Sequence, residues 1–434
     1  MFRVRSLRPA ITAIVLAAAT TAGTARGAGF ALFEQGAKAT ALGGAFVAQA
    51  DDPSAMFYNP AGNAFIEKFT LEGGTFLILR PTADFDGLNP YPGAGYHTES
   101  KKALYYIGNG YGVLPVAKGF NIAAGFWTPY GLGVPWQDPD TFRGRFISQR
   151  ADLRMVALSV QASVKLADWL AIGAGPELRF SDVKLSKNVG LVNPFTQKVV
   201  DVAHLSLITQ GTPVKVTWTA GILFKPCERL RVGASYHAHV DFDYTGTAYF
   251  GQIPSGSPQF DAAVAQRIPF GSAGAPGSTT LQFPSLSMFG ISYDVTPKLT
   301  LNADGNYTTW KVFDRTVIRI QGLPDTVLQH DWKSTWTFRT GLQFRPNNSM
   351  WFGGGFVYDQ TPQPDEDVSP FLPDGNRTGA SIGAGFRLSK MFTVEVASLF
   401  LWFHERTIVT NHDNYSGKYK TFAILPGVSI KGSF

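Results

Sequence analysis

Cysteine, charged residues and long apolar runs are all scarce in this chain of 434 residues. Cys227 is the single cysteine, so the chain cannot form an internal disulfide and is not a disulfide-bonded scaffold. Charged residues make up 16% of the sequence, against roughly a quarter in an average soluble protein. Beyond residue 27, no run approaches the roughly 18 apolar residues that a membrane-spanning helix requires. The rest of the chain therefore either crosses no membrane or crosses one as a closed β-barrel.

The net charge and the mean hydropathy exclude two further classes of protein. The net charge of +6 includes three arginines within the first eight residues, and no basic cluster marks a nucleic-acid-binding surface. A mean hydropathy close to zero excludes a bundle of membrane helices. The alternating apolar and polar faces of a barrel wall give such an intermediate value.

The N-terminus has the three parts of a secretory signal peptide. Residues 1–8 are basic, residues 9–25 are apolar or small, and small residues lie where cleavage is expected. We predict cleavage after Gly27, with Ala25 as the alternative, so residues 1–27 form the signal peptide.

Apolar and polar residues alternate along most of the chain after residue 69. Residues 154–165, for example, place Val156, Leu158 and Val160 on one face and Ser159 on the other, which is the period of a half-buried strand. An even number of such strands is typical of bacterial barrels. We predict fourteen strands, at about residues 70–80, 101–110, 119–128, 152–166, 169–185, 212–224, 229–244, 279–295, 298–313, 333–345, 349–360, 379–388, 391–408 and 418–434.

The connections between these strands alternate between short turns and long loops, as in an outer-membrane barrel. Aromatic residues near the strand ends are interpreted as two interfacial girdles, with Trp169, Trp351 and Phe392 at the short-turn end and Trp310, Trp332, Trp336 and Trp402 at the long-loop end. A soluble β-sandwich also alternates, but the girdles favour an antiparallel transmembrane β-barrel. The terminal Phe434 resembles the signature by which outer-membrane proteins are recognised for insertion.

The two longest loops are expected to carry function because they are too long for simple connections. Residues 186–211 are unusually apolar, and residues 245–277 contain a predicted helix at 257–267 with an N-capping serine and an early proline. Two apolar loops that face water must cover each other or bind an apolar ligand.

Residues 28–69 differ from the rest, because they are rich in glycine and alanine and show no clear period. Asp51–Ser54 and Tyr58–Gly62 are predicted turns. An ordinary loop-rich lead-in to a soluble domain has the same composition. The strands that follow favour a segment enclosed by a barrel.

The chain resembles the FadL family of outer-membrane transporters for long-chain fatty acids and other hydrophobic compounds. Ala28-Gly29-Phe30 at the mature start, Ala50–Ser54, and above all Asn59-Pro60-Ala61 carry the resemblance, and the strand count agrees with it. The family implies a fourteen-stranded barrel with an N-terminal segment folded inward as a hatch. It also implies a weak outer groove between two long loops, a tighter site inside the barrel, and an inward kink in the third strand that opens the wall sideways.

These implied features assign roles to particular residues. Residues 128–135 follow the third predicted strand, and their prolines and glycines would suit a kink, although a strand that simply ends in a loop explains them equally well. The hatch and its gate are assigned to Ala28, Gly29, Phe30, Asn59, Pro60 and Ala61, and the lateral opening to Pro129, Gly131, Gly133 and Pro135. The terminal arm is expected to move while Asn59-Pro60-Ala61 stays anchored; a static plug is the alternative.

The ligand is expected to meet apolar side chains in the lumen. On the strand at 391–404, Leu399, Leu401 and Phe403 share one phase and line the upper lumen unless the phase is reversed. Arg179 and Arg339 lie in the polar phases of their strands. Each either pairs with a substrate carboxylate or pairs with a carboxylate of the lumen such as Glu177.

Two other chemistries have candidate residues in the sequence. His237, His239, Asp241 and Asp243 alternate on one predicted strand and could hold a metal ion together, although a polar ladder facing the lumen explains them better. Ser235 is in phase with His237, but no third catalytic partner and no Gly-x-Ser-x-Gly motif support an outer-membrane lipid hydrolase. We therefore expect no metal, no cofactor and no enzymatic activity.

We interpret the chain as a monomeric, passive channel of the bacterial outer membrane, with a signal peptide at 1–27, a hatch at 28–68 and a barrel at 69–434. Its expected partners are outer-membrane lipid, lipopolysaccharide and a hydrophobic ligand. A long-chain fatty acid is the favoured ligand and a monoaromatic hydrocarbon is the alternative.

Overall fold

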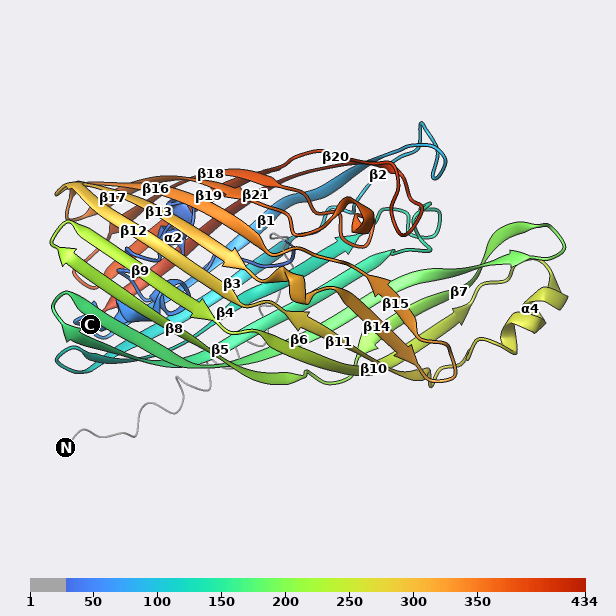
Figure 1. Ribbon diagram of the computed structural model, residues 1–434, viewed down its shortest axis with the longest axis horizontal. Helices are drawn as coiled ribbons and strands as arrows, with labels where there is room; N and C mark the ends of the chain where they lie inside the picture. The colour runs from blue at the N-terminus through green and yellow to red at the C-terminus, as the bar shows by residue number, and fades with distance from the viewer. Residues whose placement is uncertain (1–28) are drawn as a thin grey trace.

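The computed structural model describes residues 29–434, so the predicted signal peptide and Ala28 lie outside the described residues. Fourteen long antiparallel strands close into a barrel, because the first strand pairs with both its neighbour and the last strand (Figure 1). These strands are β1 (Thr70–Gly87), β3 (Tyr105–Ala117), β4 (Phe120–Pro135), β5 (Arg150–Ala167), β6 (Leu170–Asn193), β8 (Val214–Cys227), β9 (Leu230–His237), β12 (Leu286–Thr296), β13 (Leu299–Thr308), β16 (Thr335–Asn347), β17 (Met350–Asp359), β18 (Arg377–Arg387), β19 (Phe392–Phe403) and β21 (Gly417–Ser433). The predicted fourteen-stranded barrel is confirmed.

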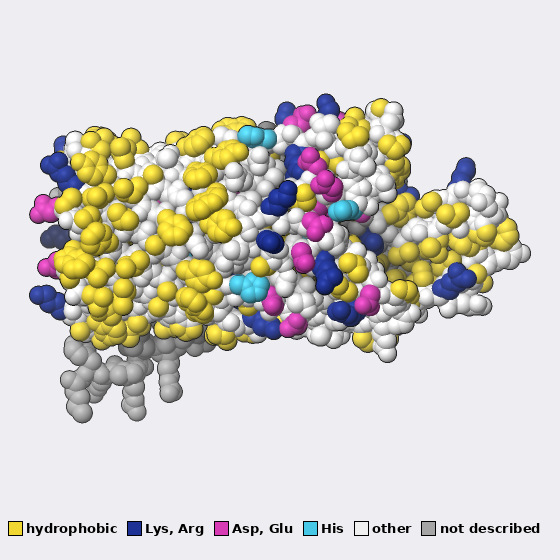
Figure 2. All heavy atoms as spheres, in the orientation of Figure 1, with side chains coloured by type: hydrophobic (Ala, Val, Ile, Leu, Met, Phe, Trp, Pro, Cys, Tyr) yellow, Lys and Arg dark blue, Asp and Glu magenta, His cyan; other side chains and the backbone are white. Residues whose placement is uncertain are grey.

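The outer face of the wall is covered with apolar side chains (Figure 2). On β19, Val396 and Trp402 are exposed while Leu399 and Leu401 are buried, so successive side chains face outward and inward in turn. Apolar surfaces of this extent are rare on soluble monomers, and on the face shown in Figure 2 charged residues appear only beyond the two edges of the apolar band. This surface is suited to contact with lipid.

The long-loop end of the barrel carries an extension built from β7 (Lys198–Thr209), β10 (Val240–Gln252), α4 (Pro258–Ala265) and β11 (Ala275–Phe283). The two long loops were predicted without strands, and the structure corrects this: β7 pairs with β6 and β10, and β10 pairs with β11. Val202, Leu205, Phe250 and Val264 form an apolar cluster between them. The two apolar loops therefore cover each other. The predicted helix is present as α4.

Shorter elements complete the long-loop end: β2 (His97–Glu99), β14 (Arg315–Ile320), β15 (Thr326–Gln329), β20 (Arg406–Ile408), and the 3₁₀ helices η3 (Trp310–Val312) and η4 (Asp365–Asp367). Among the residues that the structure describes, no helix is long and apolar enough to span a membrane.

The predicted aromatic girdles are only partly correct. Trp169, Trp336, Phe392 and Trp402 are exposed on the outer face. Trp310, Trp332 and Trp351 are instead buried. Trp351 follows the inward phase of β17, whereas Trp310 and Trp332 lie outside regular strands, where alternation does not fix the direction of a side chain.

Candidate functional site

Residues 29–66, which we call the inner segment, lie inside the barrel and contain α2 (Ala37–Ala41), α3 (Ala55–Tyr58) and η2 (Pro60–Phe65). Every residue from 29 to 64 is buried except Asp51. Barrel strands on several sides supply partners. The hydroxyl oxygens of Ser429 (β21) and Ser381 (β18) accept from the amides of Ala37 and Gly43, and the Asn121 side-chain amide (β4) donates to the carbonyl of Asn63. The inner segment therefore fills the lumen.

Glycines of the wall allow the inner segment to approach the strands closely. A Cβ atom added to any of seven inward-facing glycines would lie within 3.0 Å of an inner-segment atom, and these are Gly173, Gly221, Gly233, Gly290, Gly341, Gly355 and Gly383. They lie on seven of eight successive barrel strands from β6 to β18. The eighth strand is β13, where Asp304 instead accepts hydrogen bonds from the amides of Phe46 (2.7 Å) and Val47 (2.9 Å). The lumen is thus shaped to the backbone of this segment.

Asn59-Pro60-Ala61 lies against β8. The Asn59 side-chain amide donates to the carbonyl oxygens of Val47 (2.9 Å) and Ile222 (3.0 Å), and its oxygen accepts from the amide of Ala61 (3.2 Å). Pro60 begins η2, where it has no amide hydrogen to leave unpaired. One asparagine therefore joins two parts of the inner segment to the wall.

Residues 29–35, which we call the arm, are bonded to an irregularity in the third barrel strand, β4. The register between β4 and β5 shifts between Trp127 and Tyr130. There, Leu32 donates its amide to the carbonyl of Pro129 (2.9 Å), and Gly131 donates its amide to the carbonyl of Phe30 (2.9 Å). The alternative of a strand that ends in a loop is wrong, because β4 continues to Pro135, and Gly133 and Pro135 pair regularly with β5.

The side chain of Phe30 is surrounded by aromatic rings, which we call the aromatic box. The ring centroids of Trp310 (4.7 Å), Phe313 (5.5 Å), Phe283 (5.7 Å), Trp332 (5.7 Å) and Tyr130 (6.0 Å) surround the Phe30 centroid. At the preceding Gly29, where φ is +61°, a Cβ atom would lie 2.7 Å from the Trp332 ring. The Gly29 amide donates to Asp374 Oδ2 (3.0 Å) in the loop between β17 and β18.

A buried ion pair lies next to the arm. Arg179 Nη2 donates to Glu177 Oε2 (2.8 Å), and Glu177 Oε1 bonds to His237 Nδ1 (3.0 Å), whose Nε2 bonds to the carbonyl of Phe57 (2.8 Å). Of the two readings of Arg179, pairing with Glu177 is the one observed. A small cavity of about 20 Å³ lies between Arg179, His237, Pro129, Tyr130 and the arm.

Arg339 also contacts the inner segment rather than open lumen. Its Nη1 donates to the carbonyl of Gly43 (2.9 Å), and its guanidinium lies 4.4 Å from the centroid of the Phe33 ring. The structure therefore places both predicted arginines beside the inner segment.

Leu399, Leu401 and Phe403 face inward, in the predicted phase. They belong to an apolar cluster with Leu32 of the arm and with side chains from several other strands, namely Phe76, Ile78, Ile107, Val357 and Leu425. The arm thus lies between this cluster and the aromatic box.

The hypothesis that His237, His239, Asp241 and Asp243 share one face is wrong. The predicted strand is interrupted at residues 238–239, between β9 and β10, so the side chains change face. His237 is buried inside, whereas His239 pairs with Asp241 (2.7 Å) and Asp243 pairs with Lys215 (2.7 Å) at exposed positions. Ser235 donates to the carbonyl of Tyr58 (2.6 Å). No metal site or catalytic set forms from these residues.

Comparison with known proteins places the chain among membrane transporters. Residues 17–434 match the family model described as outer membrane protein transport protein (OMPP1/FadL/TodX). The long-chain fatty acid transport protein of Escherichia coli (strain K12) is 22% identical, with 98% of each chain covered, and the 47 kDa outer membrane protein of Pasteurella multocida is 23% identical, with 88% of this chain and 89% of the relative covered.

Solved structures share the fold. A Pseudomonas aeruginosa FadL homologue superposes with a TM-score of 0.81 at 22% identity, covering 94% of this chain and 100% of the homologue. The Ralstonia pickettii toluene transporter TbuX superposes with a TM-score of 0.68 at 18% identity, covering 93% and 99%.

Proposed function

Because this chain belongs to the OMPP1/FadL/TodX family of outer membrane transport proteins, we propose that it takes up long-chain fatty acids, with the inner segment as a movable hatch. Members of the family are transporters of hydrophobic compounds in the bacterial outer membrane and are not enzymes. The proposal adds a substrate class, a route and a gate to this family function.

Capture is assigned to the base of the extension. An apolar groove there is lined by Val183, Leu185, Leu207, Ile208 and Ile318, which come from β6, β7 and β14. An acyl chain that lies in this groove is partly removed from water and is close to the long-loop end of the lumen. Transport then needs no energy source, because apolar surface farther inside binds the chain in turn.

The inner apolar cluster around Leu399, Leu401 and Phe403 is the proposed main site. Burial of about a dozen methylene groups at about 0.8 kcal/mol each gives an upper bound near 10 kcal/mol before the costs of association. Apolar contact therefore dominates affinity. Among the described residues, Arg179 Nη1 has no hydrogen-bond partner, which makes it the donor best placed to bind a carboxylate.

The contact between the arm and β4 is the observation that carries the proposal. The backbone groups at the irregularity of β4 bond to Phe30 and Leu32 rather than to a neighbouring strand. Withdrawal of the arm would expose these groups and empty the aromatic box. We infer that ligand and Phe30 compete for this space and that the wall opens sideways at Pro129–Pro135, which delivers the ligand into the membrane. A ligand drives this change only by its higher affinity for the open arrangement.

The aromatic box favours one second candidate. Five aromatic rings already enclose a phenyl group, so a monoaromatic hydrocarbon would fit where Phe30 lies. Binding of oleate, methyl oleate and toluene to the detergent-solubilised protein separates the two proposals. Oleate binding at least tenfold tighter than toluene supports a fatty-acid transporter, whereas the reverse order supports an aromatic-hydrocarbon channel. Binding of none of the three would contradict both.

A further inference from the structure

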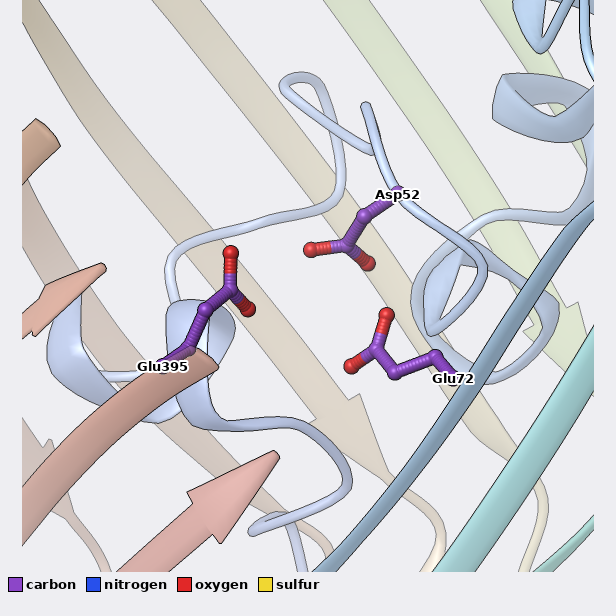
Figure 3. A group of neighbouring side chains, drawn as sticks. All are labelled: Asp52, Glu72 and Glu395. Carbon is purple, nitrogen blue, oxygen red and sulfur yellow. The ribbon is translucent and has the colours of Figure 1, made fainter. Parts of the chain in front are cut away.

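Three carboxylates converge at the contact between the inner segment and the wall. Asp52 belongs to the inner segment, Glu72 to β1 and Glu395 to β19, and Figure 3 shows the three carboxylate groups turned toward a common space. One oxygen from each lies within 4.8 Å of the others. All three side chains are at least nine-tenths buried, at 2%, 4% and 1% exposure.

Most of these oxygens have no protein partner. Among the described residues, neither oxygen of Glu72 accepts a hydrogen bond, and the same is true of Asp52 Oδ2 and Glu395 Oε2. A buried carboxylate without partners is costly, so such atoms call for a partner from outside the protein, either water or a cation. Figure 3 shows the carboxylate groups that carry these oxygens turned toward one another.

The charges near this space do not balance. Lys431 is the adjacent cation, with its Nζ 3.1 Å from Glu395 Oε1. The other nearby lysine, Lys38, pairs with Asp51 at 2.7 Å and is thereby neutralised. Three carboxylates therefore face one ammonium group, and the two formal negative charges that remain equal the charge of one divalent cation. A buried charge of this size needs compensation.

We propose that Asp52, Glu72 and Glu395 bind one calcium ion, whatever substrate the barrel carries. An all-oxygen set selects a hard cation, and Ca²⁺ accepts six to eight oxygen ligands in a flexible geometry, whereas Mg²⁺ demands a near-ideal octahedron and usually keeps several waters. The three oxygens, which lie within 4.8 Å of one another, are close enough to share one ion, and the irregular set from a turn and two strands suits the more flexible calcium.

Access and hydration are also provided. A cavity of about 590 Å³ lies beside Glu395 and Lys431 and reaches the short turns at Pro297-Lys298 and Pro346–Ser349. Water in this cavity completes the six to eight ligands that calcium usually takes. The bound ion joins the turn at Asp52 to two wall strands, so it anchors the inner segment at the short-turn end and leaves the arm free.

The test measures binding of calcium alone to the mature chain, folded in detergent without lipopolysaccharide and stripped with a chelator. We expect one calcium per chain, bound at least tenfold more tightly than magnesium, and a rise in melting temperature on calcium addition. Glu72→Gln should weaken calcium binding at least tenfold, because it removes charge without removing a protein hydrogen bond. Asp52→Asn, which keeps an acceptor for Ser54, should do the same. The exposed Asp241→Asn is the matched control and should bind as the parent does.

Heat-modifiable migration in gel electrophoresis verifies that each variant is folded. Absence of stoichiometric calcium binding by the folded parent would overturn the proposal and indicate carboxylates that share protons instead. Binding that both Glu72→Gln and Asp52→Asn retain in full would overturn it equally. Neither result would bear on fatty-acid uptake, which is measured separately.

Discussion

Phe30→Ala should raise the affinity of the barrel for its ligand. The Phe30 ring is 4% exposed and is enclosed by five aromatic side chains, and truncation of such a phenylalanine costs about 3–5 kcal/mol. Phe30 lies outside the barrel strands, so this cost reduces docking of the arm rather than stability of the closed barrel. Since about 1.4 kcal/mol is a factor of ten, the ratio of docked to free arm should fall by about two to three and a half orders of magnitude.

The assay is binding of a fluorescent fatty acid, together with amide exchange of residues 29–35. If ligand and arm compete, Phe30→Ala should bind at least tenfold more tightly and exchange these amides faster, with an unchanged melting temperature. Phe65→Ala is the matched control, because Phe65 lies at the other end of the inner segment, in η2, and should not change affinity. Unchanged affinity and exchange in Phe30→Ala would refute competition and leave a static plug.

Three further substitutions test other parts of the site. Gly221→Val should dislodge the turn at Asn59, because a Cβ atom added at Gly221 would lie 2.2 Å from Asn59 Oδ1, and cells that carry this variant should become sensitive to hydrophobic antibiotics. Gly73→Val is the control, because a Cβ atom there would meet open space, and it should not change sensitivity. Equal sensitivity of the two variants would contradict a lumen fitted to the inner segment. Arg179→Gln should weaken oleate binding about tenfold and leave methyl oleate binding unchanged, because a charge-assisted hydrogen bond contributes about 1.5–3 kcal/mol. Equal losses of affinity for both ligands would exclude recognition of the carboxylate by Arg179. Leu401→Asp should abolish binding in a barrel that still shows heat-modifiable migration, with Leu401→Met as control; unchanged binding would remove β19 from the site.

The fourteen barrel strands could be predicted because each carries its own alternation, which is a local signal. The break at residues 238–239 could not, since this short stretch of irregular backbone moves His239 to the opposite face from His237 without changing the residue types. The aromatic box was hidden for a related reason. Trp310 lies in η3 and Trp332 in irregular chain, so their position near a strand end suggested the outer girdle while the fold turns them inward.

Contacts between distant parts of the chain could also not be predicted from the sequence. Pairing of β7 with β10 joins two segments that each looked like a loop, and such pairing depends on the closed barrel that holds them together. The bond between the arm and β4 has the same origin, because Pro129 and Gly131 are unusual in a strand but do not reveal which backbone pairs with them. Asp52, Glu72 and Glu395 are likewise far apart in sequence and meet only in the folded barrel.

The most direct test of the central claim is a disulfide between the arm and β4. Ala31 and Tyr130 face each other in an isolated antiparallel bridge, a spacing that a disulfide can close, so Ala31→Cys and Tyr130→Cys are combined with Cys227→Ser. We predict that the oxidised protein fails to take up oleate and that reductant restores uptake to the level of the single-cysteine variants. Full uptake by verified, cross-linked protein would contradict a gate that requires the arm to leave the wall.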